Sequence, residues 1–457
     1  MRNIMASRDS DWREEAENSI LLKAVSHWRE EPERWFQGSY DRLPETVRVN
    51  PMSEEKDWVE SWLSGVGANR IPWFSGPGSA WEMPFTRGSA QEEVKILMAA
   101  LHDTGRITRQ EAVSMLPVLA LDPTPGHIVL DLCASPGSKT TQICEHLGDS
   151  GAVIANEVIS GRVNTLVTNV HRHASRAVLV VQHDGRHIPK VPGSGFDGVL
   201  VDVPCTGSGT TRKNPDVWGK WRPSSGRSLH SLQYDLLRRA IAVTKPGGRV
   251  VYSTCSLDPI ENEAVVSRAV AGGKVRVIPC GDSLSGVPSN PGMANWALLN
   301  DRGELDVEST FEEYLFPPKD EAVSSQLSDC LRIWNDEIGG GGFFLAVLEK
   351  VQGEDVSRTT DPFPSQKTFD DPESFPRPID EEREIELREV WGSVPSNMWS
   401  RGKSLLWSSD EIRKIWGADR TRKSGKELIP GDRWRPLKVI HLGLIAARLR
   451  KGSLDRT

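Results

Sequence analysis

Two hydrophobic patterns alternate along the middle of the chain. Some stretches carry apolar residues at three- and four-residue spacing, the period of an amphipathic helix, and others are short continuous Val/Ile/Leu runs typical of buried strands. Helices are predicted over residues 89–105, 107–121, 138–147, 160–173 and 228–244. Strands are predicted over residues 127–133, 152–157, 177–184, 196–204, 249–255 and 341–350. Buried strands that alternate with helices predict an α/β, Rossmann-like domain with a doubly wound, mostly parallel sheet over residues 96–350.

The segments on either side lack this alternation. Residues 1–95 are mixed and contain many tryptophans, and we expect a separate N-terminal region there. Residues 351–384 are acidic and rich in proline, which predicts a linker. Residues 385–457 form a smaller, basic C-terminal region.

Composition is that of a soluble globular protein. The 457 residues are too many for one ordinary core, and the hydrophobic content of 37% stands beside a charged content of 26%. We find no signal peptide and no run of the roughly 18 apolar residues that a membrane helix needs. The net charge of −7 argues against a globally basic nucleic-acid binder but allows a local basic groove. The six cysteines form no CxxC pair, so we expect free thiols in a reducing compartment.

Polar residues stand at the carboxyl ends of the predicted strands, where ligands bind in open α/β sheets. Any one of them alone would be explained as a cap or turn residue. Their agreement at five strand ends predicts a functional site. The residues are Asp131, Glu157, Asp184, Asp202 with Cys205, and Thr254 with Cys255.

The loop after the first strand, "CASPGSK", indicates which cofactor to expect. It lacks the G-x-G-x-x-G of a dinucleotide site, and it lacks the first glycine of a phosphate-binding P-loop. A tight loop followed by an acid at the second strand end suits an adenosine-bearing ligand without phosphates, since a carboxylate can take both ribose hydroxyls. S-adenosylmethionine meets this description. The expected cofactor-binding loop comprises Cys133, Ala134, Ser135, Pro136, Gly137, Ser138 and Lys139.

Other chemistries fit less well. The histidines of "VHRH" and "HDGRH" lack the further ligands that would complete a metal site, so no metal is expected. No G-x-S-x-G elbow follows any strand, which argues against serine hydrolysis. Cys205, which follows a proline at a strand end, can be a nucleophile, a helper or a core residue on these grounds.

Several long motifs resemble the Nop/Sun family of RNA cytosine-5 methyltransferases, and the resemblance is best to its tRNA-methylating branch. It covers residues 40–350 and rests on "DLCASPGSKTTQ", "DVPCTGSGTTRKNPDVWGKW", "LHSLQYDLLRRA" and "VVYSTCSLDPIENEAVV". The later segment "LKVIHLGLIAA" is faintly similar to the start of a PUA-like RNA-binding domain. The resemblance implies S-adenosylmethionine-dependent methylation of RNA, with tRNA as substrate.

Residue roles follow from the same resemblance. Cys255 matches the nucleophile that adds to C6 of cytosine, and Cys205 matches the second cysteine, which assists release. Glu157 stands where the family has an aspartate for the ribose, and its longer side chain must retract slightly. Asp184 matches the acid near adenine. Asp202 matches an acid that approaches both the cofactor and the target base, and Lys139 is expected to support the same charge network.

RNA is expected to contact a basic segment beside Cys205, residues 211–227, as well as the N-terminal region. Trp218 and Trp221 in this segment can stack on bases or belong to the core. The C-terminal stretches "RKIWGADRTRKSGK" and "ARLRKG" suggest a second contact or a nuclear-targeting patch. We expect a monomer, in the nucleus or alternatively the cytoplasm. The candidate RNA-binding residues are Arg212, Lys213, Lys220 and Arg222.

Three rival functions remain. A DNA cytosine-5 methyltransferase would use the cysteine after proline as nucleophile, whereas here the "STC" cysteine matches that role. An inactive RNA-binding assembly factor would have lost a cysteine or a cofactor acid, and none is lost. A Rossmann oxidoreductase would need the glycine fingerprint that the first loop lacks.

Overall fold

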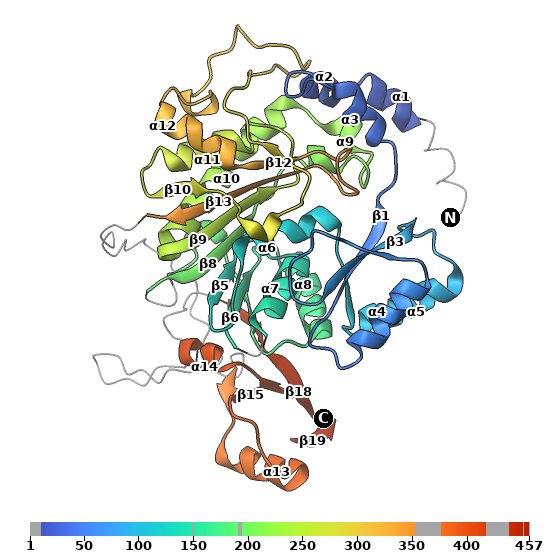
Figure 1. Cartoon of the computed structure of the whole chain (residues 1–457). Coiled ribbons are helices and arrows are strands. Elements are labelled where there is room, and N and C mark those ends of the chain that lie inside the picture. Colours follow the sequence, from blue (N-terminus) through green and yellow to red (C-terminus); the bar gives the residue numbers. More distant parts are fainter. Residues whose placement is uncertain are drawn as a thin grey trace, which may run out of the picture.

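One large sheet runs through the centre of the molecule (Figure 1). The computed structural model describes residues 11–148, 150–190, 194–351, 376–416, 438–450 and 452–456. The strands of this sheet follow the order β11-β12-β13-β9-β8-β5-β6-β7-β17, and β10 also pairs with β13. Its outer strands on one side are β10 (Val275–Ile278), β11 (Asn290–Pro291), β12 (Leu331–Ile333) and β13 (Phe343–Lys350).

The five central strands are mutually parallel, which confirms the predicted fold class. β13 runs antiparallel to β9 at one side of this parallel core. The central strands are β5 (Ile128–Asp131), β6 (Ala152–Asn156), β7 (Val178–Gln182), β8 (Phe196–Asp202) and β9 (Thr244–Thr254). The helices between them are α7 (Ser138–Leu147), α8 (Ser160–His173) and α10 (Pro223–Val243).

Helices cover both faces of this sheet, as its continuous apolar strands require. Successive side chains of a strand point to opposite faces, so Val129 packs with α7 and α8 while Leu130 packs with α10 and α11 (Glu263–Val270). α10 begins five residues before its predicted start, because Pro223 suits the first turn of a helix. The strands therefore end between two helical layers, and their carboxyl ends are the open edge.

A second, four-stranded sheet lies beside α7 and α8, in the order β2-β3-β1-β4 (Figure 1). The helix predicted over residues 107–121 is wrong in its first part, where the chain forms β4 and pairs with β1. This pairing overrides the helical period of the sequence. A 3₁₀ helix follows at Ala112–Met115, and the α-helix begins at Leu116, with Pro117 in its first turn. The elements are β1 (Pro44–Val49), α4 (Lys56–Gly65), β2 (Asn69–Arg70), β3 (Ser79–Thr86), α5 (Glu92–Asp103), β4 (Ile107–Arg109) and α6 (Leu116–Leu121).

Three short N-terminal helices pack against the segment that was expected to contact RNA. Trp218 is fully buried, with its ring centroid 5.4 Å from that of Trp35, and Trp221 meets Trp28 edge to face at 5.7 Å. Both tryptophans of the segment therefore belong to the core, which decides the alternative that the sequence left open. The elements are α1 (Asp11–Glu17), α2 (Ile20–Val25), α3 (Pro32–Gly38) and α9 (Val217–Lys220).

The C-terminal region contributes a strand to the large sheet and forms a small sheet of its own. β17 (Lys438–Leu442) pairs antiparallel with β7. The predicted linker and basic stretch fall largely on residues 352–375 and 417–437, outside the described residues. The remaining elements are α12 (Glu321–Ser324), β14 (Arg377–Pro378), α13 (Glu381–Trp391), β15 (Met398–Arg401), β16 (Ser404–Trp407), α14 (Asp410–Trp416), β18 (Leu444–Arg450) and β19 (Ser453–Arg456).

The domain boundaries proposed from the sequence remain a prediction. The strand pairings place residues 96–109 with the N-terminal sheet, since α5 and β4 pack and pair there. Within the described part of the chain, every helix is too short or too polar to cross a bilayer.

Candidate active site

The predicted cofactor loop follows β5 and is tied to α8. Ser135 Oγ donates to the carbonyl of Arg162 at 3.1 Å, and Arg162 Nη2 donates back to the carbonyl of Ser135 at 2.8 Å. Gly137 has a φ of 111°, which side chains rarely allow, and a Cβ there would lie 3.0 Å from Leu166 Cδ1. The loop is therefore held close to α8 at the carboxyl end of β5.

Lys139 and Asp202 meet at this edge of the sheet. Lys139 Nζ lies 2.9 Å from Asp202 Oδ2, while Ser253 Oγ donates to Asp202 Oδ1 at 2.7 Å. Burial alone would lower the pKa of Lys139, but the neighbouring Asp202 carboxylate outweighs burial and raises it. The structure thus brings together the two residues that were expected to share a charge network.

Asp131 lies beneath this ion pair and is almost completely buried. Thr140 Oγ1 donates to its Oδ2 at 2.6 Å, and its Oδ1 has no hydrogen-bond partner among the residues described. Burial raises the pKa of Asp131 to about 7. The edge therefore holds an acid that can be neutral or charged near physiological pH.

The two further predicted acids lie at the neighbouring strand ends. Glu157 is buried, and its carboxylate turns back to accept from the backbone N–H of Ile159 at 2.9 Å, with Arg162 at 3.6 Å. Asp184 accepts from the backbone and the guanidinium of Arg186, and the hydrogen bond from that guanidinium lowers the pKa of Asp184. Both carboxylates thus stand where the sequence predicted them, each with a local partner.

The two candidate cysteines lie side by side. The Sγ atoms of Cys205 and Cys255 are 3.3 Å apart, and neither is in a disulfide. They meet because β8 and β9 are adjacent parallel strands and both cysteines follow the carboxyl ends. The hydrogen bond with Cys255 is the first cause that raises the pKa of the Cys205 thiol well above its usual value, followed by burial and by the charges of Cys255 and Glu261.

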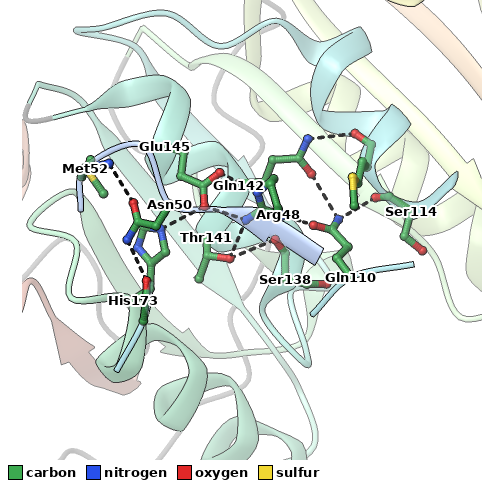
Figure 2. Close-up of polar contacts among 12 residues, drawn as sticks. Arg48, Asn50, Met52, Gln110, Ser114, Ser138, Thr141, Gln142, Glu145 and His173 are labelled. Atoms are coloured by element: carbon green, nitrogen blue, oxygen red, sulfur yellow. Dashed lines mark hydrogen bonds and ion pairs between the residues drawn. The ribbon is translucent and has the colours of Figure 1, made fainter. Parts of the chain in front are cut away.

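A buried polar network joins the N-terminal sheet to α7 (Figure 2). Arg48 of β1 is fully buried and donates to both oxygens of Glu145, from Nε at 2.5 Å and from Nη2 at 2.9 Å. The same Nη2 donates to Thr141 Oγ1 at 3.1 Å, and His173 Nε2 lies 3.2 Å from Glu145. Since α7 begins at Ser138, Arg48 fixes the helix that carries Lys139.

Two glutamines extend this network toward the large sheet. Arg48 also donates to Gln110, and Gln110 Nε2 lies 3.1 Å from Gln142 Oε1 (Figure 2). Gln142 in turn donates to the carbonyl of Met115 at 3.0 Å. Residues of β1, the segment after β4, and α7 are therefore held together by paired polar groups.

A cavity of about 940 Å³ opens between the N-terminal sheet, the cofactor loop, α8 and the segment after Gly209. Among the described residues, its lining is strongly cationic, and the acids that line it are Glu45 and Glu111. Arg109 pairs with Glu45, and Arg172 pairs with Asp103 outside the lining. The basic lining residues are Arg13, Arg42, Arg87, Arg109, Lys139, Arg172, Arg212 and Lys213.

The four candidate RNA-binding residues divide into two pairs. Arg212 and Lys213 line the cavity, although Arg212 also donates to the carbonyl of Gly340 at 3.0 Å. Lys220 pairs with Asp216 away from the cavity, and Arg222 donates to neighbouring carbonyls. Their role in binding RNA stays a prediction.

Comparison with known proteins identifies the family. Residues 118–284 match the family described as 16S rRNA methyltransferase RsmB/F. A ribosomal RNA small subunit methyltransferase F of Escherichia coli is 34% identical over 419 residues, which cover 88% of this chain and 77% of that protein. The chain belongs to the RsmB/F family. The segment matched to the family holds the cofactor loop, all the strand-end acids and both cysteines.

Other RsmB/F relatives carry tRNA names. A multisite-specific tRNA:(cytosine-C(5))-methyltransferase of Saccharomyces cerevisiae is 36% identical over 63% of this chain and 46% of its own length. A tRNA (cytosine(34)-C(5))-methyltransferase of Drosophila melanogaster is 40% identical over 61% and 42%. The chain thus spans less than half the length of these two proteins.

A solved structure named as a methyltransferase homologue has a similar fold. A methyltransferase homologue from Pyrococcus horikoshii is 28% identical, with a TM-score of 0.54, and the match covers 72% of this chain and 93% of that one. The residues that line the N-terminal side of the cavity precede, in the sequence, the segment matched to the RsmB/F family.

Sequence reasoning missed several residues that complete the site. Arg48 and the cavity arginines other than Arg212 were not among the predicted site residues, and only the fold brings them to the elements around Lys139. Glu261, in contrast, lies within the quoted "STCSLDPIENE" motif, but nothing in the motif indicates that its side chain reaches back to the cysteine loops. An acid in the same motif as a candidate nucleophile was the signal in the sequence that could have pointed to Glu261.

Proposed function

We propose that this RsmB/F chain is an S-adenosylmethionine-dependent RNA cytosine-5 methyltransferase. The observation that carries the proposal is the pair of thiols 3.3 Å apart at two adjacent strand ends. One thiol is needed to add to C6 of cytosine, since C5 alone is too weakly nucleophilic to take a methyl group. A second thiol beside it serves the later loss of the C5 proton.

The acids along the sheet edge fit the proposed cofactor. Glu157 and Asp184 stand at successive strand ends, where the ribose and the adenine would lie. Asp202 adds negative charge that suits a sulfonium group, and so does Asp131 when it is ionised; Asp131 Oδ1 has no partner among the described residues. When bound, S-adenosylmethionine supplies an electrophilic methyl group.

Charges around the two sulfurs support the assignment of Cys255 as nucleophile. Lys139 lies near Cys255: burial lowers the pKa of Lys139, while Asp202 first, and Cys255 more weakly, raise it. Glu261 instead lies near Cys205 and helps to raise the pKa of its thiol. An anion beside Cys205 makes the sulfur of Cys205 a strong proton acceptor, which suits the residue that takes up a proton late in the reaction.

Each of these residues has its own step in the proposed reaction. The Cys255 thiolate forms a bond to C6, and the electron pair of the C5–C6 bond becomes available at C5 for the methyl group. Cys205, as its thiolate, then takes up the C5 proton, and the electrons of the C5–H bond re-form the double bond as the bond between Cys255 and C6 breaks. Lys139 and Asp202 orient the base and support the charge that develops on it.

Single cysteine variants test this division of roles. Cys255→Ala should abolish both tritium transfer to RNA and any covalent complex. Cys205→Ala should stop turnover while a methylated RNA–protein adduct accumulates and shifts the band on a denaturing gel. An adduct that appears only in the Cys255 variant would reverse the roles, and equal methylation of DNA and RNA would reject the substrate class.

We propose tRNA as the substrate, with small-subunit ribosomal RNA as the second candidate. The tRNA names of the yeast and fly relatives support the first, and the 77% coverage of the E. coli ribosomal RNA methyltransferase supports the second. The basic cavity beside Lys139 suits the phosphates of either RNA. Bisulfite sequencing of both RNA classes, with and without the gene, separates the candidates by which one loses a methylated cytosine.

A further inference from the structure

The carboxylate of Glu261 lies fully buried between the two loops that carry the cysteines. Thr206, the residue after Cys205, donates to it from its backbone N–H at 2.9 Å and from its hydroxyl at 2.5 Å. Ser256, the residue after Cys255, donates from its hydroxyl at 2.5 Å. One side chain therefore holds the chain directly after both thiols.

The surrounding donors fix the direction of these hydrogen bonds. Trp221 Nε1 can only donate, and it reaches Thr206 Oγ1 at 3.1 Å, so the Thr206 hydroxyl sends its own proton to Glu261. Ser256 Oγ accepts from the N–H of Asp258 at 3.1 Å, lies 3.0 Å from the hydroxyl oxygen of Ser208, and donates to Glu261. Glu261 is the acceptor in both contacts.

A glutamine from α10 completes the carboxylate's shell. Gln233 Nε2 donates to Glu261 Oε2 at 2.9 Å and to the carbonyl of Pro204 at 3.0 Å, so it braces the loop on the other side of Cys205. Four donors fill the acceptor positions of an ionised carboxylate. No lysine, arginine or histidine in the described ranges forms an ion pair with it, and its charge is balanced by neutral donors alone.

We propose that Glu261 is the positioning residue that sets the distance and orientation between the two thiols. The inference rests on the proposed roles of Cys205 and Cys255, and it adds the residue that holds the two sulfur atoms in a fixed relative position. Two sulfurs on separate loops would otherwise depend on loop geometry alone. A misplacement of about 1 Å at a reacting pair can cost on the order of 100-fold in rate.

The charge of Glu261 also affects the pKa of the Cys205 thiol, and this effect distinguishes a positioning role from a purely structural one. A buried anion beside Cys205 favours its protonated form, and removal of that charge should make the Cys205 thiol more acidic. A role confined to stability would leave thiol acidity unchanged. The titratable or charged groups that face this cluster are Cys255, Asp202, Tyr252, Asp258, Glu263 and Arg332.

Glu263 offers a matched control two residues along the chain. It is also fully buried, but Arg332 neutralises it through two hydrogen bonds, at 2.5 and 2.6 Å. The substitution Glu263→Gln removes the same charge at the same depth without touching Thr206 or Ser256. The changes in kcat and in the Cys205 midpoint of Glu263→Gln therefore show what the loss of a buried charge does when that charge lies away from the thiols.

The experiment compares Glu261→Gln, Glu261→Asp and Ser256→Ala with the full-length protein and with Glu263→Gln. Iodoacetamide labelling from pH 6 to pH 10, followed by peptide mass spectrometry, gives the pH midpoint for each cysteine. Tritium transfer gives kcat and both KM values. We expect Glu261→Gln to lower kcat by about 100-fold with little change in either KM, and to move the Cys205 midpoint to lower pH. Glu261→Asp keeps the charge, so the pH midpoint of Cys205 should stay high. Its kcat should still fall, because the shorter side chain cannot reach both loops.

Ser256→Ala removes one attachment and keeps the charge, so it should lower kcat without moving the Cys205 midpoint, even if Glu261→Gln fails to fold. A wild-type kcat for Glu261→Gln, or a midpoint shift equal to that of Glu263→Gln, would overturn the inference. If the unaltered protein methylates no RNA, the proposed function fails instead. The labelling midpoints still decide whether Glu261 controls the thiol pair.

Discussion

Glu145 and Glu261 are both buried carboxylates, yet the structure compensates their charges in different ways. Glu145 faces Arg48 from the N-terminal sheet and His173 from α8 (Figure 2). Within the part of the chain that the structure describes, Glu261 receives its hydrogen bonds from neutral donors. The first arrangement joins distant parts of the fold, whereas the second leaves a net negative charge beside reactive thiols.

The difference extends to the pKa values of each region. Burial would raise the pKa of Glu145, but Arg48 outweighs it and the pKa is lowered. Asp258, next to Glu261, shows the reverse: burial first, and then the charge of Glu261, raise its pKa to about 8. A compensated carboxylate stabilises the fold over a wide pH range, while an uncompensated one makes its neighbours sensitive to pH.

The largest expected effect comes from breaking the compensated pair. Arg48→Ala leaves Glu145 buried and charged, which should cost about 3–5 kcal/mol in the free energy of unfolding. Urea denaturation followed by circular dichroism measures this loss. The double variant Arg48→Met with Glu145→Leu should recover most of it, and a loss below about 1 kcal/mol for Arg48→Ala would show that the pair is not compensating.

A smaller loss is expected at the other carboxylate. Glu261→Gln keeps the shape of the side chain and some of its hydrogen bonds, so the free energy of unfolding should fall by about 1–3 kcal/mol. The same denaturation experiment provides the comparison. If this variant loses as much stability as Arg48→Ala, the mode of charge compensation is not what distinguishes the two sites.

The two sites also differ in how they make the stability of the fold depend on pH. Because the folded-state pKa of Asp258 is raised to about 8, the folded protein holds a proton that the unfolded chain has lost above about pH 4. Stability should therefore fall as pH rises toward 8, by about 1 kcal/mol per unit from this group. Asp258→Asn should flatten the decline measured between pH 6 and 8. An unchanged slope would contradict the raised pKa.

The smallest effect concerns the basic cavity, which adjoins the Arg48 network. Lys213 and Lys220 lie in the same segment, but only Lys213 lines the cavity. Lys213→Gln should weaken RNA binding and reduce the slope of log K against log salt by about 0.7, the value for one single-strand phosphate contact. Filter binding at several salt concentrations tests this, with Lys220→Gln as the control that should leave the slope unchanged. Equal effects of both variants would place the RNA elsewhere.

The central domain was predictable because its signals are local. Continuous apolar runs such as those of β6 and β8, and a helix such as α8 at its predicted limits, follow from periodicity within a few residues. The N-terminal sheet was not predictable in this way. Residues 107–109 follow a helical period, and only pairing with β1 makes them a strand.

The sequence by itself determined the doubly wound fold, the edge at which the acids gather, and the presence of two cysteines at adjacent strand ends. These properties depend on residue type and short-range order, which the chain carries directly. The tertiary structure alone decided that Trp218 is core, that Arg48 meets Glu145, and that Glu261 spans both cysteine loops. Such contacts join residues far apart in the chain, and burial and pairing become defined only when the elements pack.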